Sequence, residues 1–246
     1  MANEKIRKAF SLAIDRNELI QTFTGGQGAW AFMGALPNAF SQDEIRRVVR
    51  YDQAEAKRLL TEAGYPNGLS LEMLFPPKAY GDWFDSTLQL IQVQVKRVGF
   101  DVQLNAVETA ELSNRRKVGD YQLAGGGTLG LFPDIDSNLF GTYHPSSGNN
   151  QSHVDDPKLT VMIEAQRREA DPARRQEMIR QAGLYINENA IGQLPLYRTP
   201  TGFFWHPYVK GQYPNFADAG TTYTPFTVGT SLACGAPLGV GPFRWH

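Results

Sequence analysis

The feature that most constrains the fold is a helix that stops at a glycine and leads into an extended apolar strand, a unit that occurs twice in succession. In the first unit Asp52 can cap the helix, Gly64 ends it, and residues 69–75 alternate apolar and polar side chains after a Pro-Asn-Gly turn. In the second, residues 85–100 form an amphipathic helix and residues 101–108 alternate again. Repeated helix–strand units of this kind build an α/β layer.

The rest of the chain predicts more helices and one more strand. Residues 4–20 favour two short helices with a new N-cap at Asp15. Asp-Pro pairs at 156–157 and 171–172 predict two helix starts, because Asp suits the cap and Pro the first turn. "DYQLAGGG" indicates a third strand, followed by a long loop over residues 132–156. The predicted fold class is α/β, a mixed sheet flanked by helices.

Composition and charge exclude several classes of function. The formal net charge is -1, which gives no field for steering toward nucleic acid or anionic lipid. No run reaches the roughly 18 apolar residues that a membrane-spanning helix needs. The single Cys234 forms no internal disulfide, and His144, His153, His206 and His246 lack the spacing of a zinc site. We therefore expect no metal and no cofactor.

Five segments together resemble the C-terminal half of the extracytoplasmic solute-binding proteins of peptide-type ABC transporters, family 5. They are "IRKAFSLAIDRNELI", "YDQAEAKRLLTEAGYPNGLSLEML", "IQVQVKRVGFDVQL", "GDYQLAGGG" and "ADPARRQEMIRQAGLYINENAIGQLPLYR", which occur in the family's order within residues 3–216. The resemblance implies one lobe of a periplasmic-binding-protein-like fold. It implies a protein that binds a peptide or similar solute, has no catalytic residues, and delivers the solute to an ABC permease.

The resemblance also implies a domain organisation and a location. Residues 1–200 correspond to the C-terminal lobe, residues 201–228 to a return segment toward the first lobe and hinge, and residues 229–246 to an atypical, poorly packed tail. The first lobe and an export signal would precede the start of this chain, and the parent protein would be periplasmic or extracytoplasmic. A lobe without its partner exposes apolar surface, which predicts a homo-oligomer.

Several side chains in loop-like stretches are candidates for contact with a ligand. Trp30, Trp83 and Phe132 lie among glycine, proline and polar residues, where large rigid rings often line ligand clefts. Asn149 and Asn150 match an asparagine-containing loop of the relatives. They either donate hydrogen bonds to a ligand or satisfy their own loop backbone.

The peptide-binding members of the family use a Trp and an Asp after the third strand, and the Asp pairs with the α-amino group of the peptide. The resemblance places Thr128 and Leu131 at these two positions, so both anchors are replaced in this chain. Asp134 and Asp136 follow within a few residues and are candidate replacements. The alternative is that both carboxylates cap turns of the loop.

The alternative function is a serine hydrolase, a carboxylic ester hydrolase or esterase. A serine nucleophile needs a histidine and a carboxylate within hydrogen-bond reach. One region offers these ingredients: His144, Ser146, Ser147, His153, Asp155 and Asp156. However, the chain lacks the G-x-S-x-G turn, because "GTSLA" at 229–233 has no second glycine.

Overall fold

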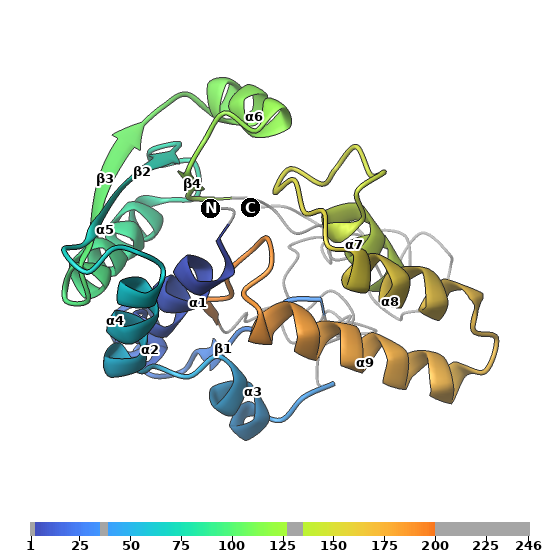
Figure 1. Ribbon diagram of the computed structural model, residues 1–246. Coiled ribbons are helices and arrows are strands. Elements are labelled where there is room, and N and C mark those ends of the chain that lie inside the picture. The colour runs from blue at the N-terminus through green and yellow to red at the C-terminus, as the bar shows by residue number, and fades with distance from the viewer. Residues whose placement is uncertain (1–2, 35–38, 127–134, 200–246) are drawn as a thin grey trace, which may run out of the picture. The chain divides into compact units, whose positions relative to one another are not determined.

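The computed structural model describes residues 3–34, 39–126 and 135–199 (Figure 1). These residues lie in one compact unit, Met1–Pro200. The expected return segment, 201–228, and the expected tail, 229–246, lie outside the described residues, so both assignments stay predictions.

The described strands form two separate small sheets. In the first, β2 (Leu69–Phe75) lies between β3 (Phe100–Ala106) and β4 (Leu123–Ala124), and both pairings are parallel. In the second, β1 (Ala29–Trp30) pairs antiparallel with β5 (Tyr197–Arg198). The α/β class is therefore confirmed, with parallel and antiparallel pairing in different sheets of the described part of the chain.

The first core lies on one face of the parallel sheet and confirms the two helix–strand units. Helix α4 (Gln53–Glu62) begins where Asp52 accepts from the amide of Glu55, and Gly64 follows its end with φ +94°. Helix α1 (Glu4–Leu12) packs against α4, and helix α5 (Asp82–Lys96) packs against β3 (Figure 1). The members of this core without exposed surface come from helices, from the residue after α1 and from β3: Ala9, Ala13, Leu19, Ala56, Val95 and Phe100.

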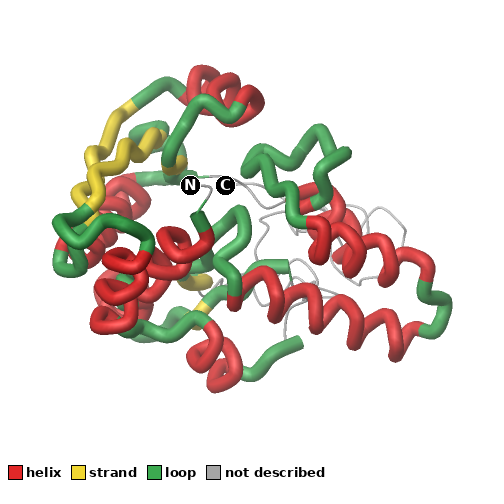
Figure 2. Tube along the Cα trace, in the orientation of Figure 1, coloured by secondary structure: helices red, strands yellow, loops and turns green. Residues whose placement is uncertain are grey.

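The second core is helical, and it corrects the predicted long loop. Residues 132–156 were expected to be irregular, but Ile135–Tyr143 form helix α7 (Figure 2). Its Ile135, Leu139 and Tyr143 are spaced four residues apart and are buried in a cluster with residues of α8 (Pro157–Arg168) and α9 (Pro172–Glu188). The Gly and Asn content suggested a loop, whereas this apolar face forms a helix.

The remaining helices differ in length and in how well the sequence predicted them. Helices α8 and α9 begin as predicted, with Asp156 and Asp171 accepting hydrogen bonds from backbone amides of their first turns. Helices α2 (Arg16–Thr24) and α3 (Gln42–Val48) border a third apolar cluster. Helix α6 (Thr109–Val118) follows β3 and was not identified in the sequence.

A fully buried guanidinium ties distant segments of this unit together. Arg16 has no exposed surface, and its Nε donates to the carbonyl of Pro195 at 2.9 Å. Its Nη1 donates to the carbonyls of Ser11, Ile14 and Val49, and its Nη2 to the hydroxyl of Ser11. Burial lowers the pKa of Arg16 to about 10, so the side chain stays charged at neutral pH. The acceptors come from the end of α1, from the residue after α3, and from the segment before β5.

Replacing Arg16 with Met is expected to destabilise the chain by about 3 kcal/mol or more, because buried carbonyl groups lose their donors. Urea unfolding of the whole chain measures this as a lower midpoint. Arg46→Met is the matched control, since Arg46 is exposed on α3 and, among the described residues, pairs with Asp43 alone. Its expected effect is at most about 0.5 kcal/mol. Equal midpoints for the two variants would contradict the structural role of Arg16.

Candidate functional site

The candidate site lies where the parallel strands β2 and β4 end. In α/β sheets, ligands bind outside the carboxyl ends of the strands. Here the segment after β2 leads to Gly81, whose φ of +95° precedes helix α5, and the segment after β4 begins with two glycines. The amide of Gly125 donates to the carbonyl of Leu74 at 2.8 Å, which holds the second segment against β2.

Three aromatic side chains form a cluster at this edge, named here the aromatic cluster: Tyr80, Trp83 and Phe84. The ring centroids of Tyr80 and Phe84 are 4.9 Å apart, and those of Trp83 and Phe84 are 6.0 Å apart, both in edge-to-face geometry. Phe84 is buried, whereas Trp83 is 49% exposed. The cluster therefore presents a fixed indole to solvent beside the sheet edge.

Gly126 packs directly against this cluster. A Cβ atom at this position would lie 2.8 Å from the ring of Tyr80 and 3.3 Å from that of Phe84, and the backbone has φ +88°. Only glycine tolerates both conditions. The segment after β4 can thus approach the rings closely.

Trp30, the other tryptophan candidate, is a core residue. It is 3% exposed, and its Nε1 donates to Oδ1 of Asn17 at 2.9 Å. The guanidinium of Arg16 lies 5.7 Å from the centre of its ring. Its surface is occupied by the protein, so of the two tryptophans only Trp83 is accessible.

The polar candidates have different surroundings. Asp136 accepts from Gln166 and pairs with Nε of Arg167 at 3.1 Å, which joins α7 to α8. Asn150 is buried, and its amide donates to the carbonyl of Val154 at 2.8 Å and accepts from the Val154 amide at 3.0 Å. Asn149 is exposed.

No hydrogen bond or ring contact joins Trp30, Trp83, Asn149 and Asn150 to one another in the described part of the chain. Phe132 and Asp134 lie outside the described residues. A ligand role for these candidates therefore stays a prediction. The burial of Trp30 and the engaged amide of Asn150 favour structural roles for these two, and Trp83 is the member whose exposure suits ligand contact.

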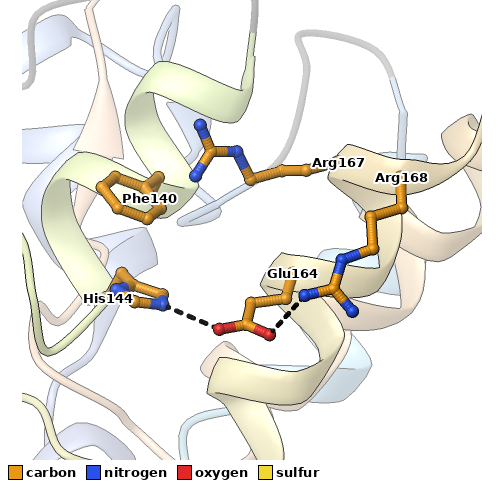
Figure 3. A pocket seen from close by; sticks show the side chains of 5 residues that line it. All are labelled: Phe140, His144, Glu164, Arg167 and Arg168. Atoms are coloured by element: carbon orange, nitrogen blue, oxygen red, sulfur yellow. Dashed lines mark hydrogen bonds and ion pairs between the residues drawn. The ribbon is translucent and has the colours of Figure 1, made fainter.

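A serine, a histidine and a carboxylate do lie close together in the region of α7 and α8. The Oγ atom of Ser146 is 2.8 Å from Nδ1 of His144, which also accepts from the backbone amide of Ser146 at 3.2 Å. Because Nδ1 accepts from an amide, the ring proton resides on Nε2, which faces Oε1 of Glu164 at 3.6 Å (Figure 3). The order of contacts is thus Ser146, His144, Glu164.

This arrangement lacks the geometry of a hydrolase site. An open pocket of about 270 Å³ lies between α7 and α8, and its lining residues are Phe140, His144, Glu164, Arg167 and Arg168 (Figure 3). Ser146 does not line this pocket and hydrogen-bonds across two residues of its own turn. The carboxylate of Glu164 also pairs with Arg168, whose Nη2 lies 3.1 Å from Oε2 of Glu164. Because Ser146 lies outside this pocket and its hydroxyl contacts His144 of its own turn, we interpret the contact as a structural turn.

Three of the other proposed hydrolase residues have structural partners. Ser147 donates to the carbonyl of Gly141, and His153 donates to the carbonyl of Arg116 at 2.9 Å. Asp156 caps α8. Within residues 3–34, 39–126 and 135–199, no group of three or more His, Cys, Asp or Glu side chains is placed to hold a metal ion. In the same ranges no helix is long and apolar enough to cross a membrane.

His144→Ala and Ser146→Ala are expected to leave the background hydrolysis of p-nitrophenyl acetate by the chain unchanged, because Ser146 does not line the pocket beside His144. Release of p-nitrophenol, followed by absorbance, gives the rate. Ser147→Ala controls for general effects of altering the loop. A rate that falls in both test variants, and not in Ser147→Ala, would restore the hydrolase hypothesis.

Comparison with known proteins identifies a family. The family model described as "Bacterial extracellular solute-binding proteins, family 5 Middle" matches residues 1–150 of this chain.

Curated relatives and solved structures agree with this match. A dipeptide-binding protein of Pseudomonas aeruginosa is 26% identical over 87% of this chain and 42% of its own length. The glutathione-binding protein GsiB of Pectobacterium atrosepticum is 34% identical over 44% of this chain and 21% of its own. The structure of HbpA2 from Haemophilus parasuis has the same fold, with a TM-score of 0.68 at 23% identity over 80% of this chain and 39% of that one. The chain therefore spans at most about two fifths of these relatives.

Proposed function

Because this chain belongs to family 5 of the bacterial extracellular solute-binding proteins, we propose that it supplies one wall of a cleft that binds a peptide or a similar small solute. The names of the relatives support this class of ligand, since one binds dipeptides and another glutathione. The whole protein would deliver its solute to an ABC permease and would work outside the cytoplasmic membrane. In this proposal residues 1–200 are one lobe.

The observation that carries the proposal is the aromatic cluster at the carboxyl edge of the parallel sheet. Phe84 is buried in the first core. Trp83 packs edge-to-face against Phe84, and about half of the surface of Trp83 is exposed. A ring that is already held in place loses little entropy when it contacts a ligand. The edge of the sheet is also where this type of fold binds its ligands.

A single wall limits the affinity of this chain. Ligand clefts bury most of the surface of their ligand, and two-lobed proteins divide this burial between two walls. We therefore expect the chain to bind peptides with a dissociation constant of about 1 mM or weaker.

Self-association through exposed apolar surface also stays a prediction. Among the described residues, the large apolar side chains that are exposed lie in one loop and on three helices: Tyr65 after α4, Trp83 and Val93 on α5, Val118 on α6 and Val161 on α8. This distribution gives a second copy of the chain no obvious single face to cover.

Trp83→Ala is expected to weaken the binding of alanyl-phenylalanine about threefold to tenfold, because the ligand loses its exposed aromatic contact. Nuclear magnetic resonance titration of the labelled chain measures the dissociation constant. The indole signal of Trp83 reports binding in the wild type, and backbone amide signals report it in the wild type and in Trp83→Ala. The indole of Trp30, bound to Asn17, is an internal reference that should not move.

Val93→Ala is the matched control, since Val93 is exposed on the same helix and lies away from the sheet edge. It should bind like the wild type. Should the dipeptide leave all amide and indole signals of the wild type unchanged at about 10 mM, the proposed function would be refuted.

A further inference from the structure

The carboxyl edge of the parallel sheet also holds a guanidinium that no described carboxylate pairs with. Arg115 and Arg116 lie side by side in the last turn of α6. The guanidinium of Arg115 pairs with three neighbouring carboxylates. The nitrogen–oxygen distances are 3.5 Å to Glu72, 3.9 Å to Glu111 and 3.0 Å to Asp120. In the described part of the chain, Arg116 is left without an acidic partner.

The contacts of Arg116 hold the side chain in place without neutralising it. Its Nη1 donates to the carbonyl of Gly126 at 3.3 Å, and its Nε is buried without an acceptor among the described residues. Its own carbonyl accepts from Nε2 of His153 at 2.9 Å, which fixes the end of α6. Buried donors without acceptors are rare in native proteins and call for an explanation.

The position of Arg116 relates it to the aromatic cluster. Gly126 accepts the hydrogen bond from Arg116, and the same glycine packs against the rings of Tyr80 and Phe84. A positive charge and an aromatic surface therefore border one short segment, immediately after β4. Nη2 of Arg116 makes no hydrogen bond to a described residue, so this nitrogen is available to donate to a ligand.

A guanidinium recognises a carboxylate well, because its planar N–H groups match the two carboxylate oxygens. We propose that Arg116 is the anion-binding residue of the solute site, and that the solute carries a carboxylate close to an apolar or aromatic group. This inference rests on the proposed function and adds the chemistry of the ligand.

The test compares alanyl-phenylalanine with its C-terminal amide, which differs only in the carboxylate. By resonance titration of the whole chain, the acid should bind the wild type about tenfold more tightly than the amide. Arg116→Gln should abolish this preference, and Arg116→Lys, which keeps the charge, should retain part of it. Melting temperatures show whether each variant is folded.

Lys117→Gln is the matched control, because Lys117 is the next residue, is exposed and carries the same charge. It should keep the full preference for the acid. A separate titration measures whether inorganic phosphate displaces the acid. Failure of phosphate to displace the acid supports a carboxylate site, whereas tighter binding of phosphate overturns the assignment in favour of a phosphorylated solute.

The outcomes separate two failures. If neither dipeptide binds the wild type, the proposed function itself fails. If both bind with equal affinity, or if Arg116→Gln keeps the preference for the acid, the role of Arg116 is refuted while the proposed function stands.

Discussion

The architecture depends on a positive charge that is buried among backbone carbonyl groups. Burying a charge is costly unless hydrogen bonds replace its water, and Arg16 meets this condition with donors from all three of its nitrogens. Ser11 lies in the last turn of α1, Ile14 comes two residues after this helix, and Val49 directly follows α3. The C-terminal ends of helices carry partial negative charge, which suits a guanidinium. Pro195 brings in the segment that leads to β5.

This buried junction is linked to the candidate site through α5. Gln94 of α5 is buried, accepts from the amide of Asp15 at 3.0 Å and donates to Glu18 at 2.8 Å, so it ties α5 to the start of α2 beside Arg16. Thr87, one turn after Trp83, lies 3.2 Å from the hydroxyl of Tyr197 in β5. These hydrogen bonds hold in place the helix that carries the exposed indole, as a preformed ligand site requires.

Local sequence signals predicted the capped helices and the strands of the parallel sheet, and tertiary burial decided the site. Caps such as Asp52, Asp156 and Asp171 act within one turn, so their pattern is visible in the sequence. Trp30 and Trp83 look alike in sequence, since both occur in loop-like stretches. Only the folded chain shows that one is covered by Arg16 and neighbours, while the other is exposed. Helix α7 was missed because its apolar spacing is interrupted by glycine and polar residues.

Arg116 could not be distinguished from Arg115 by sequence, because the difference between them is which carboxylates the fold brings near. Hydrogen–deuterium exchange of the whole chain, with and without alanyl-phenylalanine, tests most directly whether this lobe is a ligand wall. If it is, the ligand adds protection in the segment around Tyr80–Phe84 and in the residues just after β4, where the rings and Gly126 meet. Protection confined to the pocket between α7 and α8 would contradict this role.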